Sequence, residues 1–175
     1  MKNEGVNNFL SNISRKYSIF LVLAALMLIS WIISENFMTI TNLSNVSRQI
    51  AVVTILAFGQ TILIISGMLD LSSGSVLALA GVLSVSAYVS TGSLMIAFVV
   101  AILASVACNI LNGIMVTTFK APPFIATLAM MTMARGAALL YTNGQNIYQI
   151  GDYTVFGQGS LFGVPNPIIM MVILL

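Results

Sequence analysis

Long apolar runs separated by short polar seams are the feature that most constrains this chain. Of its 175 residues, 59% are hydrophobic and only 6% are charged, whereas roughly a quarter of the residues in a soluble domain are charged. Nearly all of the charged residues fall between the runs. We therefore expect an integral membrane protein, for which the lipid bilayer is the solvent.

The apolar runs have the length that a bilayer requires. About 20 helical residues, each rising about 1.5 Å, cover about 30 Å of hydrocarbon. The sequence predicts an all-α, polytopic transmembrane helical bundle with spans at residues 17–34, 50–69, 71–90, 94–119 and 123–142. The first run is too long for a cleaved signal peptide, so it is predicted to be a retained helix.

A sixth apolar run begins near Pro167 and continues to Leu175. A helix this short would leave carbonyl groups without partners in hydrocarbon. We therefore expect residues 1–175 to be the N-terminal part of a longer transmembrane domain, truncated to about five spans plus the start of a sixth.

The distribution of cations predicts the orientation. Lys2, Arg15 and Lys16 precede the first span and Lys120 follows the fourth, so the positive-inside rule places the N-terminus in the cytoplasm. Arg48 is the exception, since it would lie on the outer side.

Two connections are long enough for a role of their own. In residues 35–49, Thr41 or Asn42 is predicted to cap a short helix at the membrane interface. Residues 143–166 combine glycines with aromatic side chains that suit the headgroup zone. This second connection is predicted to cover the outer mouth of a pathway, to receive a partner, or to be a solvated loop.

Stripes of small side chains occur at helical spacing in two spans, and such stripes let helix backbones approach closely in a membrane. We interpret both as packing seams rather than ligand contacts. They are Ala97, Ala101, Ala104 and Cys108 in the fourth span, and Gly74, Ala78 and Gly81 in the third.

Asp70 lies where the second span gives way to the third. Its carboxylate oxygens are suited to accept the free amides of Ser72 or Ser73 and so to cap the next helix. The functional alternative is that a helix interrupted within the bilayer lines a cavity, as it does in transporters.

Arg135 lies about 18 Å along the fifth span from Pro123. At that depth an arginine costs at least about 2.5–3.5 kcal/mol unless it snorkels or finds a partner, so it is predicted to face protein or water. Two partners are considered for it: Asp70, which the topology places nearer the inner face, and the backbone carbonyls of a broken helix.

Three amides also lie at depth, namely Gln60, Asn109 and Asn112. Each is predicted to bond between helices or to line a pore. Amide groups suit a polyhydroxylated neutral solute better than an ion.

The sequence lacks the residues that several functional classes require. The sequence has no phosphate-binding loop, which excludes an ATP-binding subunit, and no histidine, which removes histidine metal sites and general bases. It also lacks a buried acidic cluster for a proton relay and a basic surface for nucleic acid. We therefore expect no enzyme, no metal and no cofactor.

Four motifs occur in a fixed order: 42–46 (NLSNV), 57–61 (AFGQT), 66–75 (SGMLDLSSGS) and 122–128 (PPFIATL) leading to 134–136 (ARG). In this series the chain resembles the inner-membrane permease subunits of ribose-type monosaccharide ABC importers. It departs from the family at Met68 and Ala129, where glycine is usual or frequent.

The resemblance implies a transport subunit with three partners: an ATP-binding cassette subunit, an extracytoplasmic sugar-binding protein, and a second permease copy as homodimer or paralogue. It implies a multi-pass protein of the inner membrane, in contact with lipid. The candidate residues of the translocation path are Gln60, Asp70, Ser72, Asn109, Asn112 and Arg135, and those of the structural signature are Gly67, Gly74, Pro122, Pro123 and Gly136. An ion-coupled secondary transporter and a non-transporting membrane scaffold remain as alternatives.

Overall fold

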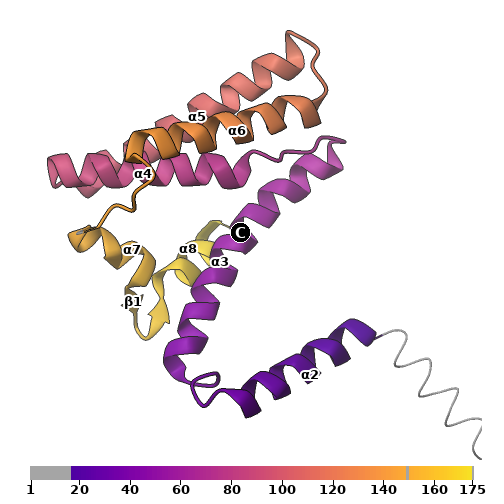
Figure 1. The fold of residues 1–175 in the computed structure, drawn as a ribbon, viewed down its shortest axis with the longest axis vertical. Coiled ribbons are helices and arrows are strands. Elements are labelled where there is room, and N and C mark those ends of the chain that lie inside the picture. Colours follow the sequence, from indigo (N-terminus) through magenta and orange to yellow (C-terminus); the bar gives the residue numbers. More distant parts are fainter. Residues whose placement is uncertain (1–16, 149, 175) are drawn as a thin grey trace, which may run out of the picture. The chain divides into compact units, whose positions relative to one another are not determined.

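The computed structural model describes residues 17–148 and 150–174. Most of them are helical, in the order α2 to α8, with one short 3-10 helix, η1, and a two-stranded hairpin (Figure 1). The prediction of an all-α fold is therefore confirmed. The chain forms two compact units, residues 1–47 and 48–175, and each is described by itself.

The first unit contains α2, Ser18–Ile33. This helix lies within the predicted first span but has only 16 residues, fewer than the ~20 that a perpendicular crossing requires. None of its residues is buried, so its apolar side chains are available to lipid around the whole circumference.

Helix α3, Ile40–Ile65, begins in the first unit and continues into the second. The hydroxyl of Thr39 accepts a hydrogen bond from the Asn42 amide at 3.3 Å, which caps the first turn. The prediction of a separate interfacial helix capped by Thr41 or Asn42 is therefore wrong. Residues 40–49 contain no glycine or proline, and the Ser47 hydroxyl bonds within the helix to the Leu43 carbonyl, so nothing interrupts it.

Helix α3 ends at Ile65, four residues before the predicted boundary at residue 69, and Gly67 forms its C-terminal cap. Its φ of 75° is left-handed, and the Met68 amide donates to the Leu63 carbonyl at 2.9 Å. This is the bond of a Schellman C-terminal cap, in which glycine avoids the clash that a Cβ would make.

Helices α4 (Ser73–Thr91), α5 (Leu94–Thr117) and α6 (Pro123–Thr142) pack against one another in the second unit (Figure 1). The α4–α5 turn uses Gly92 at φ 69° and Ser93, whose hydroxyl accepts from the Ile96 amide. Pro122 and Pro123 fix the start of α6, where a missing N–H has no cost.

The core between these three helices is small. Val76, Met130 and Ala134 form its buried cluster, with Leu79 and Cys108 packed against them. Ala97 on α5 is fully buried, so the small-residue stripe of the fourth span is confirmed as a packing seam at both of its ends.

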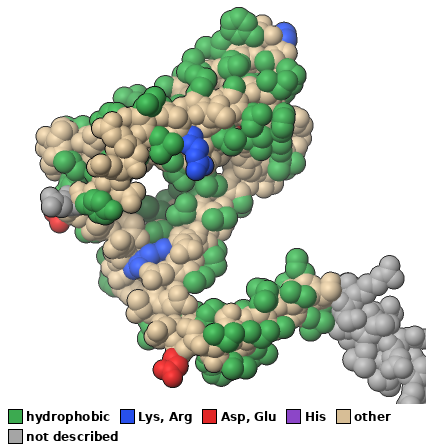
Figure 2. All heavy atoms as spheres, viewed as in Figure 1, with side chains coloured by type: hydrophobic (Ala, Val, Ile, Leu, Met, Phe, Trp, Pro, Cys, Tyr) green, Lys and Arg blue, Asp and Glu red, His purple; other side chains and the backbone are tan. Residues whose placement is uncertain are grey.

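Four helices, α3 to α6, are long and apolar enough to cross a membrane, and α2 is a shorter apolar helix. In each of the four, less than a third of the most apolar window is buried. Hydrophobic side chains consequently cover much of the surface (Figure 2). This is the outward face that lipid solvates.

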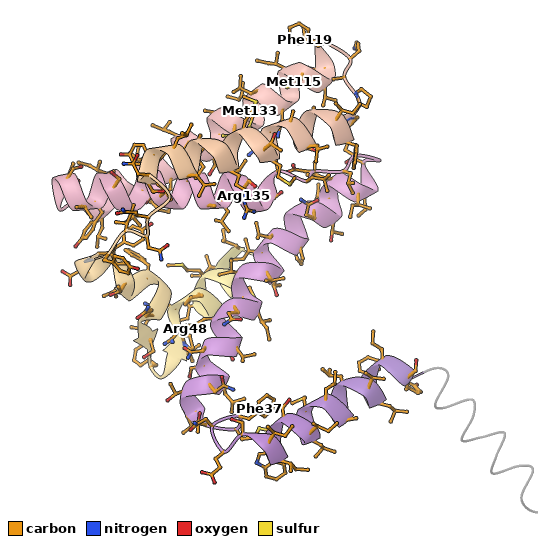
Figure 3. All side chains as sticks on the ribbon, in the orientation of Figure 1. Phe37, Arg48, Met115, Phe119, Met133 and Arg135 are labelled. Carbon is orange, nitrogen blue, oxygen red and sulfur yellow. The ribbon has the colours of Figure 1, made fainter. Side chains whose placement is uncertain are left out.

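The segment after α6 is folded rather than a simple loop. It contains η1 (Gly151–Tyr153), α7 (Thr154–Gln158), β1 (Ser160–Leu161), β2 (Val164–Pro165) and α8 (Asn166–Leu174). Tyr153 binds α4 through a 2.9 Å bond to the Ser84 hydroxyl and through its ring, 5.7 Å from that of Tyr88. Arg48, which projects from α3 (Figure 3), donates to the Gln158 carbonyl at 2.6 Å.

We predict that Gly67→Ala destabilises the protein by about 1–2 kcal/mol, because alanine is strained at positive φ. The control is Gly113→Ala, in an α5 position where an added Cβ meets no atom within 4 Å and where helix propensity favours alanine. Thermal unfolding of the two purified variants checks this. Equal melting temperatures for both would contradict the proposed cap.

Candidate translocation site

Asp70 is the centre of a polar cluster at the break between α3 and α4. Its Oδ1 accepts hydrogen bonds from the Ser72 amide at 2.7 Å and from the Ser72 hydroxyl at 2.6 Å. Its Oδ2 accepts from the Ser73 hydroxyl at 2.7 Å. The predicted cap of the third span is therefore confirmed at Ser72, and the two serine side chains add to it.

Side chains from three other helices bind the same short segment. The Gln60 amide on α3 donates to the Asp70 carbonyl and to the Ser73 hydroxyl, both at 2.7 Å. Asn112 on α5 donates to the Ser72 hydroxyl at 3.0 Å. Thr127 on α6 donates to the Leu69 carbonyl at 3.2 Å. The cluster thus joins α3, α4, α5 and α6.

Four of the six predicted path residues, Gln60, Asp70, Ser72 and Asn112, come together here. Asn109 lies beside them but does not bond to them, because its amide donates to the Ser105 carbonyl of its own helix at 2.9 Å. Asn112 is buried, and within the described residues its Oδ1 accepts no hydrogen bond. It lines a cavity of about 270 Å³ with Asp70, Asn109 and Thr127, which is large enough for ordered water.

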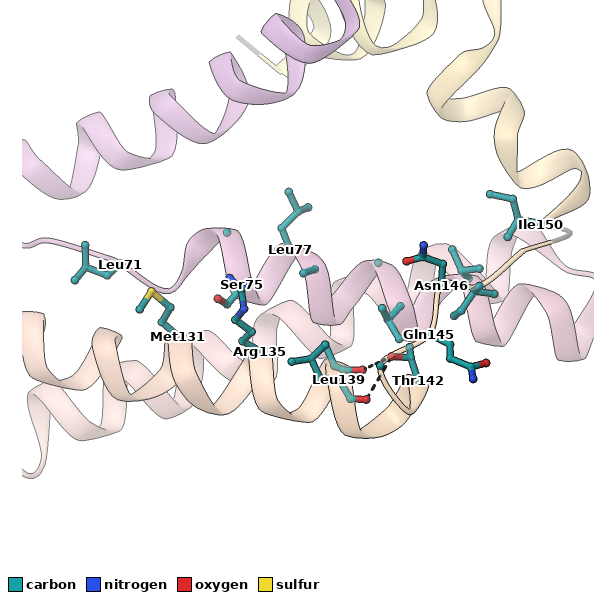
Figure 4. A pocket seen from close by; sticks show the side chains of 18 residues that line it. Leu71, Ser75, Leu77, Met131, Arg135, Leu139, Thr142, Gln145, Asn146 and Ile150 are labelled. Carbon is teal, nitrogen blue, oxygen red and sulfur yellow. Dashed lines mark hydrogen bonds between the residues drawn. The ribbon is translucent and has the colours of Figure 1, made fainter. Parts of the chain in front are cut away.

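Arg135 lies in a different place from Asp70. In the described part of the chain the two side chains do not pair, and no carbonyl bonds to Arg135, so neither predicted partner is found. The Asp70 oxygens are already occupied by the two serines. The arginine instead projects from α6 toward α4 (Figures 3 and 4).

Arg135 lines a cavity of about 830 Å³ bounded by α4, α6, residues 144–147 and Ile150. Its other polar lining residues are Ser75, Thr142, Gln145 and Asn146. The sequence did not single out Ser75, Gln145 or Asn146 as candidates. Gln145 and Asn146 are polar residues just beyond the predicted fifth span, and Ser75 is a polar residue within the predicted third span.

The predicted packing seam of the third span forms a wall of this cavity. Gly74, Ala78 and Gly81 all line it, and an added Cβ at either glycine meets no atom within 4 Å. Packing uses the neighbouring face of α4, where Val76, Ala80 and Ser84 are buried. The interpretation of that stripe as a packing seam is therefore wrong within the described chain. Gly136, on α6, likewise faces open space.

Comparison with known proteins places the chain in a family. Residues 42–174 match the family described as branched-chain amino acid transport system / permease component. A ribose import permease protein of Bacillus subtilis is 37% identical over 164 residues, which are 92% of this chain and 51% of that protein. That of Escherichia coli K12 is 36% identical over 157 residues, 86% of this chain and 49% of that protein.

A galactofuranose transporter permease protein of Escherichia coli K12 is 38% identical over 132 residues, 75% of this chain and 39% of that protein. The chain spans about half the length of the ribose permeases that it matches. No solved structure matches it. The family match and the four span-length helices show a multi-pass membrane protein.

We predict a graded response to replacement of Asp70. Asp70→Leu removes every capping bond and should lower the free energy of unfolding by about 0.5–2 kcal/mol. Asp70→Asn keeps an oxygen for the Ser72 amide and should fall between Asp70→Leu and the native protein. Thermal unfolding, with membrane levels of each variant, measures the order. Equal destabilisation by both would mean that the charge itself is needed.

Proposed function

Because the chain belongs to the branched-chain amino acid transport system / permease component family, we propose that it is part of the membrane-spanning subunit of an ATP-driven importer of a monosaccharide such as ribose. The match to ribose import permeases over most of the chain carries this proposal. Residues 1–175 would form the N-terminal part of that subunit, with the N-terminus in the cytoplasm and the protein in the inner membrane.

The chemistry of the cavities supports a neutral solute. Within the described residues no cluster of His, Cys, Asp or Glu resembles a metal site, and the Asp70 carboxylate is occupied by capping bonds. An ion-coupled transporter needs coordinating groups at the midplane, and this chain offers little for that purpose. Amides, hydroxyls and one guanidinium suit sugar hydroxyl groups.

The proposed energy source lies in another subunit. An ATP-binding cassette partner would bind and hydrolyse ATP and so favour one conformation of the permease over the other. An extracytoplasmic binding protein would deliver the sugar, and a second permease copy would complete the path. Within that path we assign Arg135 a direct role, while the residues around Asp70 hold the helices in register.

Uptake by the full-length permease in liposomes, with its ATPase and binding protein, tests the function. Labelled ribose and related monosaccharides should enter only with ATP, and dissipation of ion gradients should leave uptake unchanged. Uptake that persists without the ATPase but stops with the ion gradient would favour a secondary transporter. Absence of uptake of any solute would favour a scaffold.

We predict that Arg135→Leu reaches the membrane normally but abolishes uptake, because insertion becomes easier while the polar interaction is lost. Arg135→Lys keeps the charge without the planar five-donor fork, so uptake should be impaired. The control is Met133→Leu, an exposed position on the same helix. Uptake is normalised to membrane protein, and native uptake by Arg135→Leu would remove this residue from the path.

A further inference from the structure

The cavity beside Arg135 contains a polar group that the fold does not use. Ser75 is 9% exposed, and among the described residues its hydroxyl makes no hydrogen bond. It lines the cavity opposite α6 (Figure 4). The hydroxyl oxygen is accessible from the cavity, because it is not among the buried polar atoms without a partner, so a solute in the cavity can reach it.

Some serines in or just after these helices bond to their own backbone. The hydroxyl groups of Ser47 and Ser66 donate to the carbonyl four residues earlier, at 2.7 and 2.9 Å, which is the usual local bond of a helical serine. Ser75 does not form that bond, although Leu71 supplies a carbonyl at the corresponding position. Its hydroxyl is therefore free both to donate and to accept.

Arg135 provides a second unused group on the opposite helix. Its guanidinium carries five N–H donors, and none of them bonds to a described residue. The two groups differ usefully, because the arginine only donates whereas the serine also accepts.

The third side of the cavity is polar as well. Asn143 and Gly144 end α6 with φ values of 52° and 69°, and the Gly144 amide donates to the Leu139 carbonyl at 2.8 Å. This cap brings the next two residues, Gln145 and Asn146, onto the cavity. The side-chain amide of Gln145 has no bond within the described chain, so it adds both a donor and an acceptor.

We propose that this cavity is a binding site in the permease itself for one neutral polyhydroxylated solute, an inference that rests on the proposed function. Arg135 donates to solute hydroxyl oxygens, Ser75 and Gln145 exchange hydrogen bonds with neighbouring hydroxyls, and the side-chain-free face at Gly74 and Gly81 admits the ring. The volume of about 830 Å³ lies in the ordinary range of small-molecule sites. The permease would thus select its solute as well as conduct it.

A cysteine-protection experiment tests the site in the purified full-length permease, without ATPase or binding protein and with Cys108→Ala as background. Ala78→Cys places a thiol in the cavity lining. A water-soluble thiol reagent should label it, and ribose should slow the labelling in a saturable way. Ala107→Cys is the control, an exposed alanine on α5 that should stay unlabelled in lipid.

The dependence of protection on ribose concentration then tests the role assigned to the Ser75 hydroxyl. Ser75→Ala should raise the ribose concentration needed for half protection roughly two- to tenfold, the loss expected for one hydrogen bond. Ser90→Ala is the matched control, because this α4 serine bonds to the Ala87 carbonyl and is exposed. It should leave protection unchanged.

The outcomes separate this proposal from the proposed function. If the native transporter imports ribose while ribose gives no protection, the permease conducts without binding here and the site is refuted. Failure to label Ala78→Cys would show that other parts of the protein fill the cavity, which also refutes it. Protection by ribose without ATP-dependent uptake would support the site and contradict the importer.

Discussion

The arrangement of the second unit depends on the hydrogen bonds that the Asp70 carboxylate accepts. The chain leaves α3 at Gly67 and enters α4 at Ser73, and the backbone between them lacks helical hydrogen bonds. Unsatisfied amides and carbonyls are costly where water is excluded. Asp70 accepts the Ser72 amide, Gln60 donates to the Asp70 carbonyl and Thr127 donates to the Leu69 carbonyl. These three bonds satisfy backbone amides and carbonyls at the break between α3 and α4.

This closure also sets the rotation of α4. With Ser72 buried at its N-cap and bonded to Asn112, Val76, Ala80 and Ser84 follow on the packed side at helical spacing. Gly74, Ala78 and Gly81 then lie on the adjoining side and line the cavity. A rotation of α4 by one residue would exchange these faces. The cap and the cavity are therefore two results of one constraint.

The sequence predicted correctly the structural features that depend on residues close together in the chain. The span positions followed from apolar length, and the cap followed from a carboxylate three residues before the start of α4. The length of α3 was missed because the polar residues 41–49 suggested a separate element, although none of them breaks a helix. The folded segment after α6 was missed for another reason: its contacts, Tyr153 with Ser84 and Arg48 with Gln158, join residues far apart in sequence. The sequence shows that Ser75 is a polar residue within a span, but its lack of a hydrogen-bond partner is visible only in three dimensions.

Two charged side chains, Asp70 and Arg135, show how structural and functional polarity differ. Both oxygens of the Asp70 carboxylate accept hydrogen bonds, from two serine hydroxyl groups and a backbone amide. Arg135 bonds to nothing in the described chain and faces a cavity with polar groups on three sides. Asp70 therefore holds helices together through bonds within the protein, whereas Arg135 is exposed and keeps its donors available to a solute in the cavity. A charged residue in an apolar stretch of sequence can therefore have a structural or a functional role. Only the hydrogen bonds in the structure distinguish the two.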